Sequence, residues 1–152
     1  MSPLAVAVVD TDVFSHLFVH RHSPDPRVSA WRDTLRGRRV LISFQTRAEL
    51  LAGALTAGWG ARRQHHLRSV LDRTPTIRSD NSVIDAHAQL TAECRRRGHA
   101  LHAKQHAADR WVAASAIAKG AALLAGDAIY DGAPGVVLLT DAPPPASAHP
   151  LP

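Results

Sequence analysis

The sequence predicts a parallel α/β sandwich, and three observations support this fold class. A continuous apolar run over residues 4–9 is typical of a strand that is buried on both faces. Strand-like runs then alternate with longer helical segments, as they do when helices cover both sides of a parallel sheet. The 152 residues, of which 45% are hydrophobic, suit one domain with a sizeable core.

The first half of the chain contains three predicted strands and four predicted helices. The strand 4–9 ends at Asp10, and Pro24 and Pro26 interrupt the chain after the first helix. The next helices end at Gly37, at Gly58 and before Pro75, where glycine and proline stop helices. The expected helices are 11–19, 27–36, 46–57 and 61–71, and the expected strands are 4–9, 40–43 and a short edge strand at 76–78.

The second half contains two helices followed by two strands. Gly98 follows the long helix 81–97 in the position that favours a left-handed cap, and Gly120 follows the helix 107–119. The second of these helices is apolar on nearly every side, so we expect it to be buried. The strands 121–125 and 135–139 complete the expected sheet.

The chain is expected to be one domain, residues 1–141, with a proline- and alanine-rich flexible tail, residues 142–152. Its apolar runs are far shorter than the roughly 20 residues that span a membrane. The N-terminus lacks the basic segment of a secretory signal. A single cysteine, Cys94, excludes an internal disulfide framework and favours a cytoplasmic location.

The charge pattern indicates a polyanionic partner. The net charge is +5, with 16 arginines and only two lysines, and arginine pairs well with phosphate through its planar fork. Codon bias in a GC-rich genome is an alternative explanation. Candidate contacts to a nucleic-acid backbone are Arg21, Arg62, Arg63 and Arg110, followed by Arg68, Arg95, Arg96 and Arg97.

Four carboxylates are expected at one edge of the sheet. Asp10 and Asp127 follow strands, and ligands of open parallel sheets bind beyond the carboxyl ends of the strands. Glu49 and Asp109 lie in the first turns of helices that begin at the same edge. Four clustered carboxylates repel each other unless a cation neutralises them, and oxygen ligands suit Mg²⁺ or Mn²⁺.

Each acid also has a purely structural interpretation. Asp10 can cap the following helix, Asp109 can complement a helix dipole, and Asp127 can be a turn residue. Thr46 and Glu49 match a capping box, with Thr46 as the N-cap. It is less plausible that all four acids lie at one edge for purely structural reasons than that any one of them does.

Four segments together resemble a PIN-domain ribonuclease of the VapC toxin type. The segments are 8–13, 42–51, 108–116 and 123–127, and the resemblance covers roughly residues 4–140. It implies that Asp10, Glu49, Asp109 and Asp127 are a metal-binding quartet in a PIN-like α/β/α sandwich. Asp12 stands where the family commonly has asparagine. The resemblance also implies a cognate antitoxin and a homodimer.

These inferences predict a Mg²⁺- or Mn²⁺-dependent endoribonuclease, the toxin of a toxin–antitoxin pair. Its acidic quartet would hold metal-activated water for attack on an RNA phosphodiester, whether in tRNA, mRNA or rRNA. Asp12, Ser43 and Thr46 are expected to orient the carboxylates or the water.

Other interpretations remain open. The segment from Asp10 to Asp12, with Ser43 and Gly126-Asp127, also resembles a haloacid-dehalogenase-like phosphatase with Asp10 as nucleophile, although Val13 stands where that family usually has glycine. A non-catalytic PIN-like binding module is a further alternative. We expect the histidines from His99 to His106 to be exposed or in contact with RNA rather than to hold zinc. Trp31, Trp59 and Trp111 are expected in the core or an interface.

Overall fold

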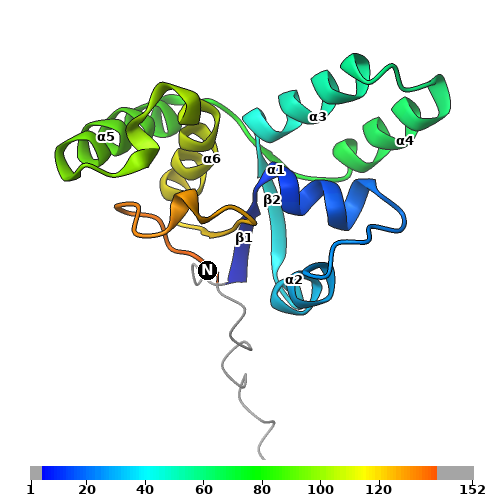
Figure 1. The fold of residues 1–152 in the computed structure, drawn as a ribbon, viewed down its shortest axis with the longest axis horizontal. Coiled ribbons are helices and arrows are strands. Elements are labelled where there is room, and N and C mark those ends of the chain that lie inside the picture. The colour runs from blue at the N-terminus through cyan, green and yellow to red at the C-terminus, as the bar shows by residue number, and fades with distance from the viewer. Residues whose placement is uncertain (1–4, 140–152) are drawn as a thin grey trace, which may run out of the picture.

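The computed structural model describes residues 5–139, and these fold around a four-stranded parallel sheet. The strand order is β3 (Thr76–Ile77), β2 (Arg39–Ser43), β1 (Val6–Val9), β4 (Ala122–Leu124). All three pairings are parallel, with Val8 opposite both Leu41 and Leu123. The strands run through the middle of the molecule between two groups of helices (Figure 1). The predicted α/β/α sandwich is therefore confirmed.

One face of the sheet is covered by α5 (Asn81–Arg97) and α6 (Ala107–Ala118). Val8 and Leu123 point to this side and are fully buried against α5 residues such as Leu90 and α6 residues such as Ala113. Short helical turns η3 (Ala100–His102), η4 (Lys104–His106) and η5 (Ala128–Tyr130) close the edge of this layer. Gly98 ends α5 in the left-handed conformation, with φ +70°, as its position predicted.

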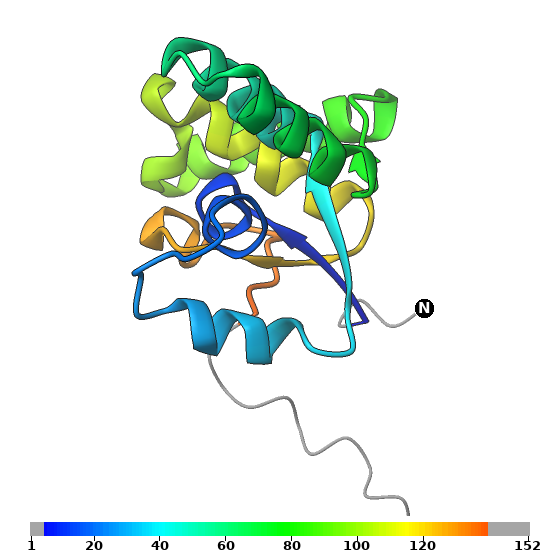
Figure 2. The same ribbon diagram turned by 90° about the vertical axis from the view of Figure 1, so that its right-hand side faces the viewer.

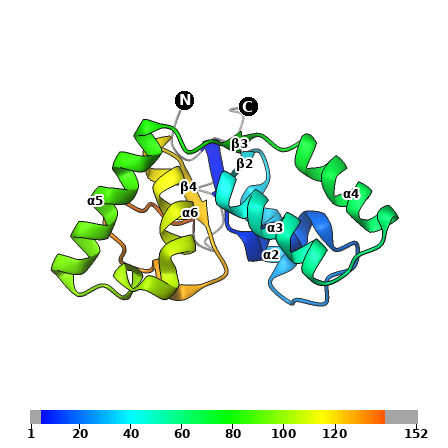
Figure 3. The same cartoon turned by 90° about the horizontal axis from the view of Figure 1, so that it is seen from above.

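The other face is covered by the remaining helices (Figure 3). Ala7, Val9 and Leu124 point to this second side, as the two-residue alternation of strands requires. The helices are α1 (Thr11–Phe14) with its π-helical continuation η2 (Ser15–Val19), α2 (Val28–Leu35), α3 (Phe44–Thr56) and α4 (Ala61–Asp72). Figure 2 shows α2 below the sheet and α4 above it on this side.

Two sequence predictions about the elements are wrong. The segment 135–139 forms no strand, because it meets the sheet only through one bridge between Leu123 and Leu138. Helix α3 begins at Phe44 rather than after Thr46, because the Ser43 hydroxyl caps it by accepting a hydrogen bond from the Gln45 amide, 3.2 Å away. The capping box of Thr46 and Glu49 is therefore absent.

Some predictions fall outside the described residues. Leu4 and the tail 142–152 are among them, so the tail stays a prediction; the first strand itself begins at Val6, because Ala5 lies in a helical turn. Within residues 5–139, none of the helices combines the length and the apolar character that crossing a membrane requires.

Candidate active site

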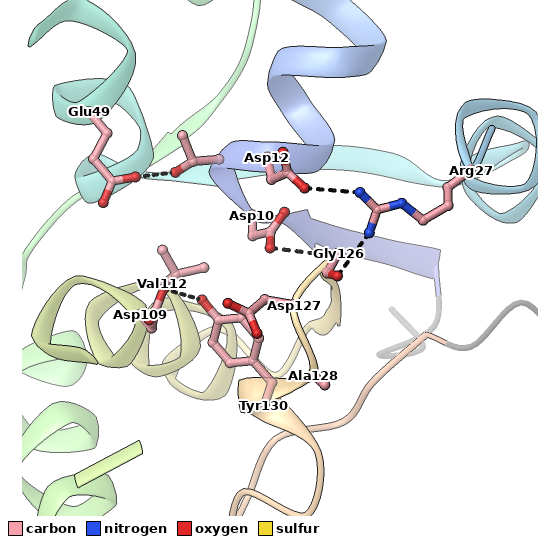
Figure 4. A pocket seen from close by; sticks show the side chains of 11 residues that line it. Asp10, Asp12, Arg27, Glu49, Asp109, Val112, Gly126, Asp127, Ala128 and Tyr130 are labelled. Atoms are coloured by element: carbon pink, nitrogen blue, oxygen red, sulfur yellow. Dashed lines mark hydrogen bonds and ion pairs between the residues drawn. The ribbon is translucent and has the colours of Figure 1, made fainter. Parts of the chain in front are cut away.

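A cavity of about 410 Å³ lies where β1 and β4 end and α3 and α6 begin. Its polar walls come from five carboxylates, one guanidinium and two hydroxyl groups (Figure 4). All four residues of the predicted quartet line it: Asp10, Glu49, Asp109 and Asp127. The fold thus brings together acids that are separated by more than a hundred positions in the chain, as the parallel sheet predicted.

Asp10 is the most buried of these acids, with 6% of its surface exposed. Its Oδ1 accepts from the Val13 amide at 2.9 Å and caps α1, while its Oδ2 accepts from the Gly126 amide at 3.2 Å. Burial raises the pKa of Asp10 to about 6, because the two amide hydrogen bonds offset only part of the lost hydration. The nearby charges of Asp12 and Asp109 raise that pKa further. The Asp10 side chain therefore both caps α1 and lines the cavity.

Asp109 lies in the first turn of α6 and is fixed by two side chains. The buried Tyr130 hydroxyl donates to Asp109 Oδ1 at 3.3 Å, and His106 Nδ1 lies 3.0 Å from Oδ2. Burial, together with the charge of Asp109, raises the pKa of Tyr130 well above its usual range. Tyr130 therefore remains protonated and acts as a donor to the carboxylate. The chain offered no signal for Tyr130 beyond its place three residues after Asp127.

Glu49 lies in the second turn of α3, half-buried at the opposite wall of the cavity. The Thr11 hydroxyl donates to Glu49 Oε2, and Gln45 Nε2 donates to Oε1 at 3.1 Å. The buried Thr46 hydroxyl is hydrogen-bonded to Thr11 at 3.1 Å, so Thr46 reaches the carboxylate only through Thr11. Sequence reasoning missed Thr11, which directly follows Asp10.

Ser43 does not have its predicted role of orienting a carboxylate. Its hydroxyl is fully buried, and its side-chain partner is the hydroxyl of Ser115 on α6, 2.8 Å away. Since it also caps α3, Ser43 links the start of α3 to the C-terminal half of α6. This is a packing role.

Asp127 and Asp12 are the exposed acids of the cavity. Asp127 Oδ1 accepts from the Ile129 amide at 2.9 Å and caps η5. Asp12 Oδ2 lies 3.5 Å from Arg27 Nη2, and its Oδ1 lies 3.3 Å from His16 Nε2. Asp12 thus contacts basic groups at the rim rather than another carboxylate.

Arg27 is the one basic residue in the cavity wall, and sequence reasoning missed it. Its guanidinium stacks 4.5 Å from the Trp31 ring centre and donates to Asp25 at 2.8 Å. The hydrogen bonds that the guanidinium and the backbone amide of Arg27 donate to Asp25 lower the pKa of this carboxyl group to about 2. Arg27 also donates to the Gly126 carbonyl at 3.0 Å. No local pattern could reveal a contact across 99 positions.

The donor set of the cavity fits a hard divalent cation. All of its acidic side chains offer oxygen atoms, which Mg²⁺ and Mn²⁺ prefer, and Asp10 is buried away from the water that would otherwise hydrate its charge. Within residues 5–139, no three His, Cys, Asp or Glu side chains stand together as a preformed metal site. The carboxylates instead hold the hydrogen bonds described above, so ion binding would require them to exchange some of these partners.

The basic candidates divide into exposed and buried residues. Arg21, Arg62 and Arg63 are exposed. Arg110, by contrast, is buried, and its Nη1 donates to the carbonyl oxygens of Leu101 and Ala103, each at 2.7 Å. Its predicted contact with nucleic acid is therefore wrong, because η3 and the residue after it fold over the side chain and take its hydrogen bonds.

The histidines of the loop before α6 have separate partners. His99 Nε2 is hydrogen-bonded to the Asp131 carbonyl at 2.7 Å, His102 Nδ1 to the His99 carbonyl at 2.7 Å, and His106 to Asp109. In the described part of the chain they form no metal cluster with other ligands.

Comparison with known families identifies the family of this fold. The model of the PIN domain matches residues 7–135, which is most of the chain. The chain belongs to the PIN-domain family. This PIN domain is 29% identical over 136 residues to Ribonuclease VapC4 of Mycobacterium tuberculosis, covering 88% of this chain and 95% of that protein. The resemblance to the VapC type is thereby confirmed, and the phosphatase interpretation gains no support.

Solved structures share the fold of this PIN domain. VapBC2 of Rickettsia felis, bound to a DNA fragment from its promoter, aligns with TM-score 0.68 and 18% identity, over 88% of this chain and 96% of that chain. FitAcB of Neisseria gonorrhoeae aligns with TM-score 0.66 and 24% identity, over 89% and 97%. VapBC-5 of M. tuberculosis, a toxin–antitoxin system, aligns with TM-score 0.62 and 23% identity, over 89% and 98%.

Proposed function

We propose that this PIN domain is a Mg²⁺- or Mn²⁺-dependent endoribonuclease and the toxin of a toxin–antitoxin pair in the cytoplasm. The observation that carries the proposal is the convergence of Asp10, Glu49, Asp109 and Asp127 on one cavity, in which Asp10 is buried with a raised pKa. The similarity to Ribonuclease VapC4 supports RNA as the substrate.

The four carboxylates would hold the divalent ion. When bound, the ion supplies Lewis-acid chemistry that activates water and offsets charge on the phosphodiester. The chain itself provides the fixed geometry: Asp10 is held by the Val13 and Gly126 amides, and Tyr130 and His106 hold Asp109. Thr11 and Gln45 hold Glu49 on the opposite wall. Such orientation reduces the reorganisation that the reaction would otherwise require.

The test measures cleavage of structured RNA with Mg²⁺, with Mn²⁺ and with a chelator. We expect metal-dependent cleavage that leaves a 5′-phosphate, and a loss of at least about a hundredfold in Asp10→Asn and Asp109→Asn. Asp85→Asn is the matched control, because Asp85 is an exposed acid of α5 outside the cavity. RNA left intact by the wild type, or hydrolysis of a phosphate monoester in its place, would contradict the proposal.

We also propose a cognate antitoxin and a homodimer as partners. The antitoxin proposal is supported by the shared fold with VapBC-5 and with a toxin–antitoxin complex of Klebsiella pneumoniae, which aligns with TM-score 0.63. Co-expression with the product of a neighbouring reading frame should yield a co-purifying complex that does not cleave RNA. Sedimentation of the isolated protein measures the dimer.

A further inference from the structure

A second cavity, of about 290 Å³, lies on the α4 side of the molecule, away from the acidic one. It is formed by the end of η2, the turn between α3 and α4, and the first turns of α4. We call it the basic cavity. The side chains that characterise it are His20, Arg21, Trp59, Arg62, Arg63 and His66.

Among residues 5–139, the basic cavity is lined by no acid. None of the carboxylates in this part of the chain lies in its wall, and the first turn of α4 has no acidic residue. Among the residues that the structure describes, no ion pair involves Arg21, Arg62 or Arg63. Three guanidinium groups that face one hollow without counter-charges repel each other, and an anion placed between them removes that repulsion.

Trp59 gives the basic cavity an aromatic wall. The Trp59 side chain is half-buried and packs against the core cluster beneath α4, which keeps it in place. The Arg63 guanidinium lies 3.8 Å from the centre of the Trp59 ring, and the His20 and Trp59 rings form a T-shaped pair with 6.5 Å between their centres. Flat guanidinium and aromatic groups stack on unpaired bases, while arginine forks bind phosphate.

Two elements connect the basic cavity with the acidic one. The helix formed by α1 and η2 begins beside Asp10 and ends before His20. Helix α3 contains Glu49, and Trp59 follows its end by three residues. At 1.5 Å per residue, the helical part of each path is about 10–14 Å long. A polymer with repeating phosphates can therefore reach both cavities at once, with a few units between them.

We propose that the basic cavity binds a phosphate and the adjacent unpaired base of single-stranded RNA, a few nucleotides from the bond that is cut. This inference rests on the proposed ribonuclease function, and it names how that site selects its substrate. Arg21 and Arg62 bind the phosphate, and Arg63, held flat on Trp59, stacks on the base. An acidic segment of a protein partner is the competing occupant.

Binding is measured without cleavage, by fluorescence anisotropy of a labelled single-stranded RNA of about 12 nucleotides in chelator. The double variant Arg62→Ala/Arg63→Ala is compared with Arg73→Ala, which changes an exposed arginine at the end of the same helix that does not line the cavity. We expect the Kd of the double variant to rise about tenfold or more and its salt slope to fall by about 1.4. Arg73→Ala should stay within about twofold of wild type, and Arg63→Lys, which keeps the charge without the planar fork, should fall between them.

Several results would overturn the inference. One is an equal loss of RNA affinity in Arg73→Ala, which would indicate an effect of net charge alone. Another is unchanged RNA affinity with lost binding of a polyglutamate peptide, which would assign the cavity to an acidic protein segment.

Two further results separate this inference from the proposed function. A wild-type protein that fails to cleave RNA but binds it through Arg62 and Arg63 contradicts the proposed function and supports this inference. Cleavage of RNA by the double variant with the KM of the wild type would support the proposed function and contradict this inference.

Discussion

Arg27 Nη1 donates to the carbonyl oxygen of Gly126 at 3.0 Å and so joins the segment before α2 to the loop after β4. The amide of the same Gly126 donates to Asp10. Gly126 therefore accepts a hydrogen bond from Arg27 and donates one to Asp10, the most buried carboxylate of the acidic cavity. This contact fixes the loop that carries Asp127.

Replacement of Arg27 by alanine should separate ion binding from catalysis. The variant removes a positive charge from the cavity wall, so we expect Mg²⁺ to bind about threefold tighter. It also releases the Gly126 loop, so the kcat of RNA cleavage should fall about tenfold. Titration calorimetry with Mg²⁺ and steady-state kinetics measure the two effects. Weaker Mg²⁺ binding in this variant would show that Arg27 does not act on the ion through its charge.

A side chain at Gly126 should displace its neighbours in the cavity wall. A Cβ at this position would lie 2.8 Å from Asp12 Oδ2, 3.2 Å from Arg27 Nη1 and 3.2 Å from the buried Trp31 ring. We expect Gly126→Ala to shift these groups, lower the free energy of unfolding by about 1–3 kcal/mol and reduce cleavage. Gly53→Ala is the matched control: nothing lies within 4 Å of its new Cβ inside α3, so it should stabilise the protein by about 0.5–1 kcal/mol. Chemical denaturation compares the two.

Asp10 should make stability fall as pH rises in the absence of metal. Its pKa is about 6 in the folded protein and 3.8 in the unfolded chain, so the folded state binds the proton more tightly. Its contribution is fully present below about pH 4 and is lost as pH rises through about 6. The change amounts to about 3 kcal/mol. Urea unfolding in chelator from pH 4 to pH 8 measures it as the difference between the wild type and Asp10→Asn. A difference that is constant with pH contradicts the raised pKa.

Replacement of Arg110 should lower the stability of the protein without weakening its RNA binding. Arg110→Ala leaves the carbonyl oxygens of Leu101 and Ala103 without their donor, so we expect about 3 kcal/mol of destabilisation. Arg95→Ala, which changes an exposed arginine of α5, should change stability by less than about 0.5 kcal/mol. Thermal unfolding compares them. At a temperature where both variants are folded, their RNA affinities should be equal, and a loss confined to Arg110→Ala would restore its predicted role in binding.

The sequence was sufficient for the sandwich and for the grouping of the acids, because both follow from short-range patterns. Apolar runs mark the strands, and the carboxyl ends of parallel strands share one edge, which placed Asp10 and Asp127 together. The assignment of these residues to metal and catalysis stays a prediction that the experiments above test.

Contacts between distant segments account for what the sequence could not predict. Arg27 meets Gly126 only after the layers pack, and Arg110 is buried only because η3 closes over it. The same holds for Ser43, whose hydroxyl pairs with Ser115 across 72 positions instead of turning to a carboxylate. The strand predicted at 135–139 does not form for a related reason. An apolar run becomes a strand only where a neighbouring strand offers several backbone hydrogen-bond partners, and this run has a single bridge.

The position of β1 between β2 and β4 also has a consequence for synthesis of the protein. Asp10 and Glu49 leave the ribosome early, but the amide of Gly126, Asp109 and the pairing of β1 with β4 come from the last third of the chain. An N-terminal fragment lacks half of the acidic cavity. The proposed ribonuclease site is therefore assembled only after the segment from Asp109 to Gly126 has been made and has packed against the earlier strands.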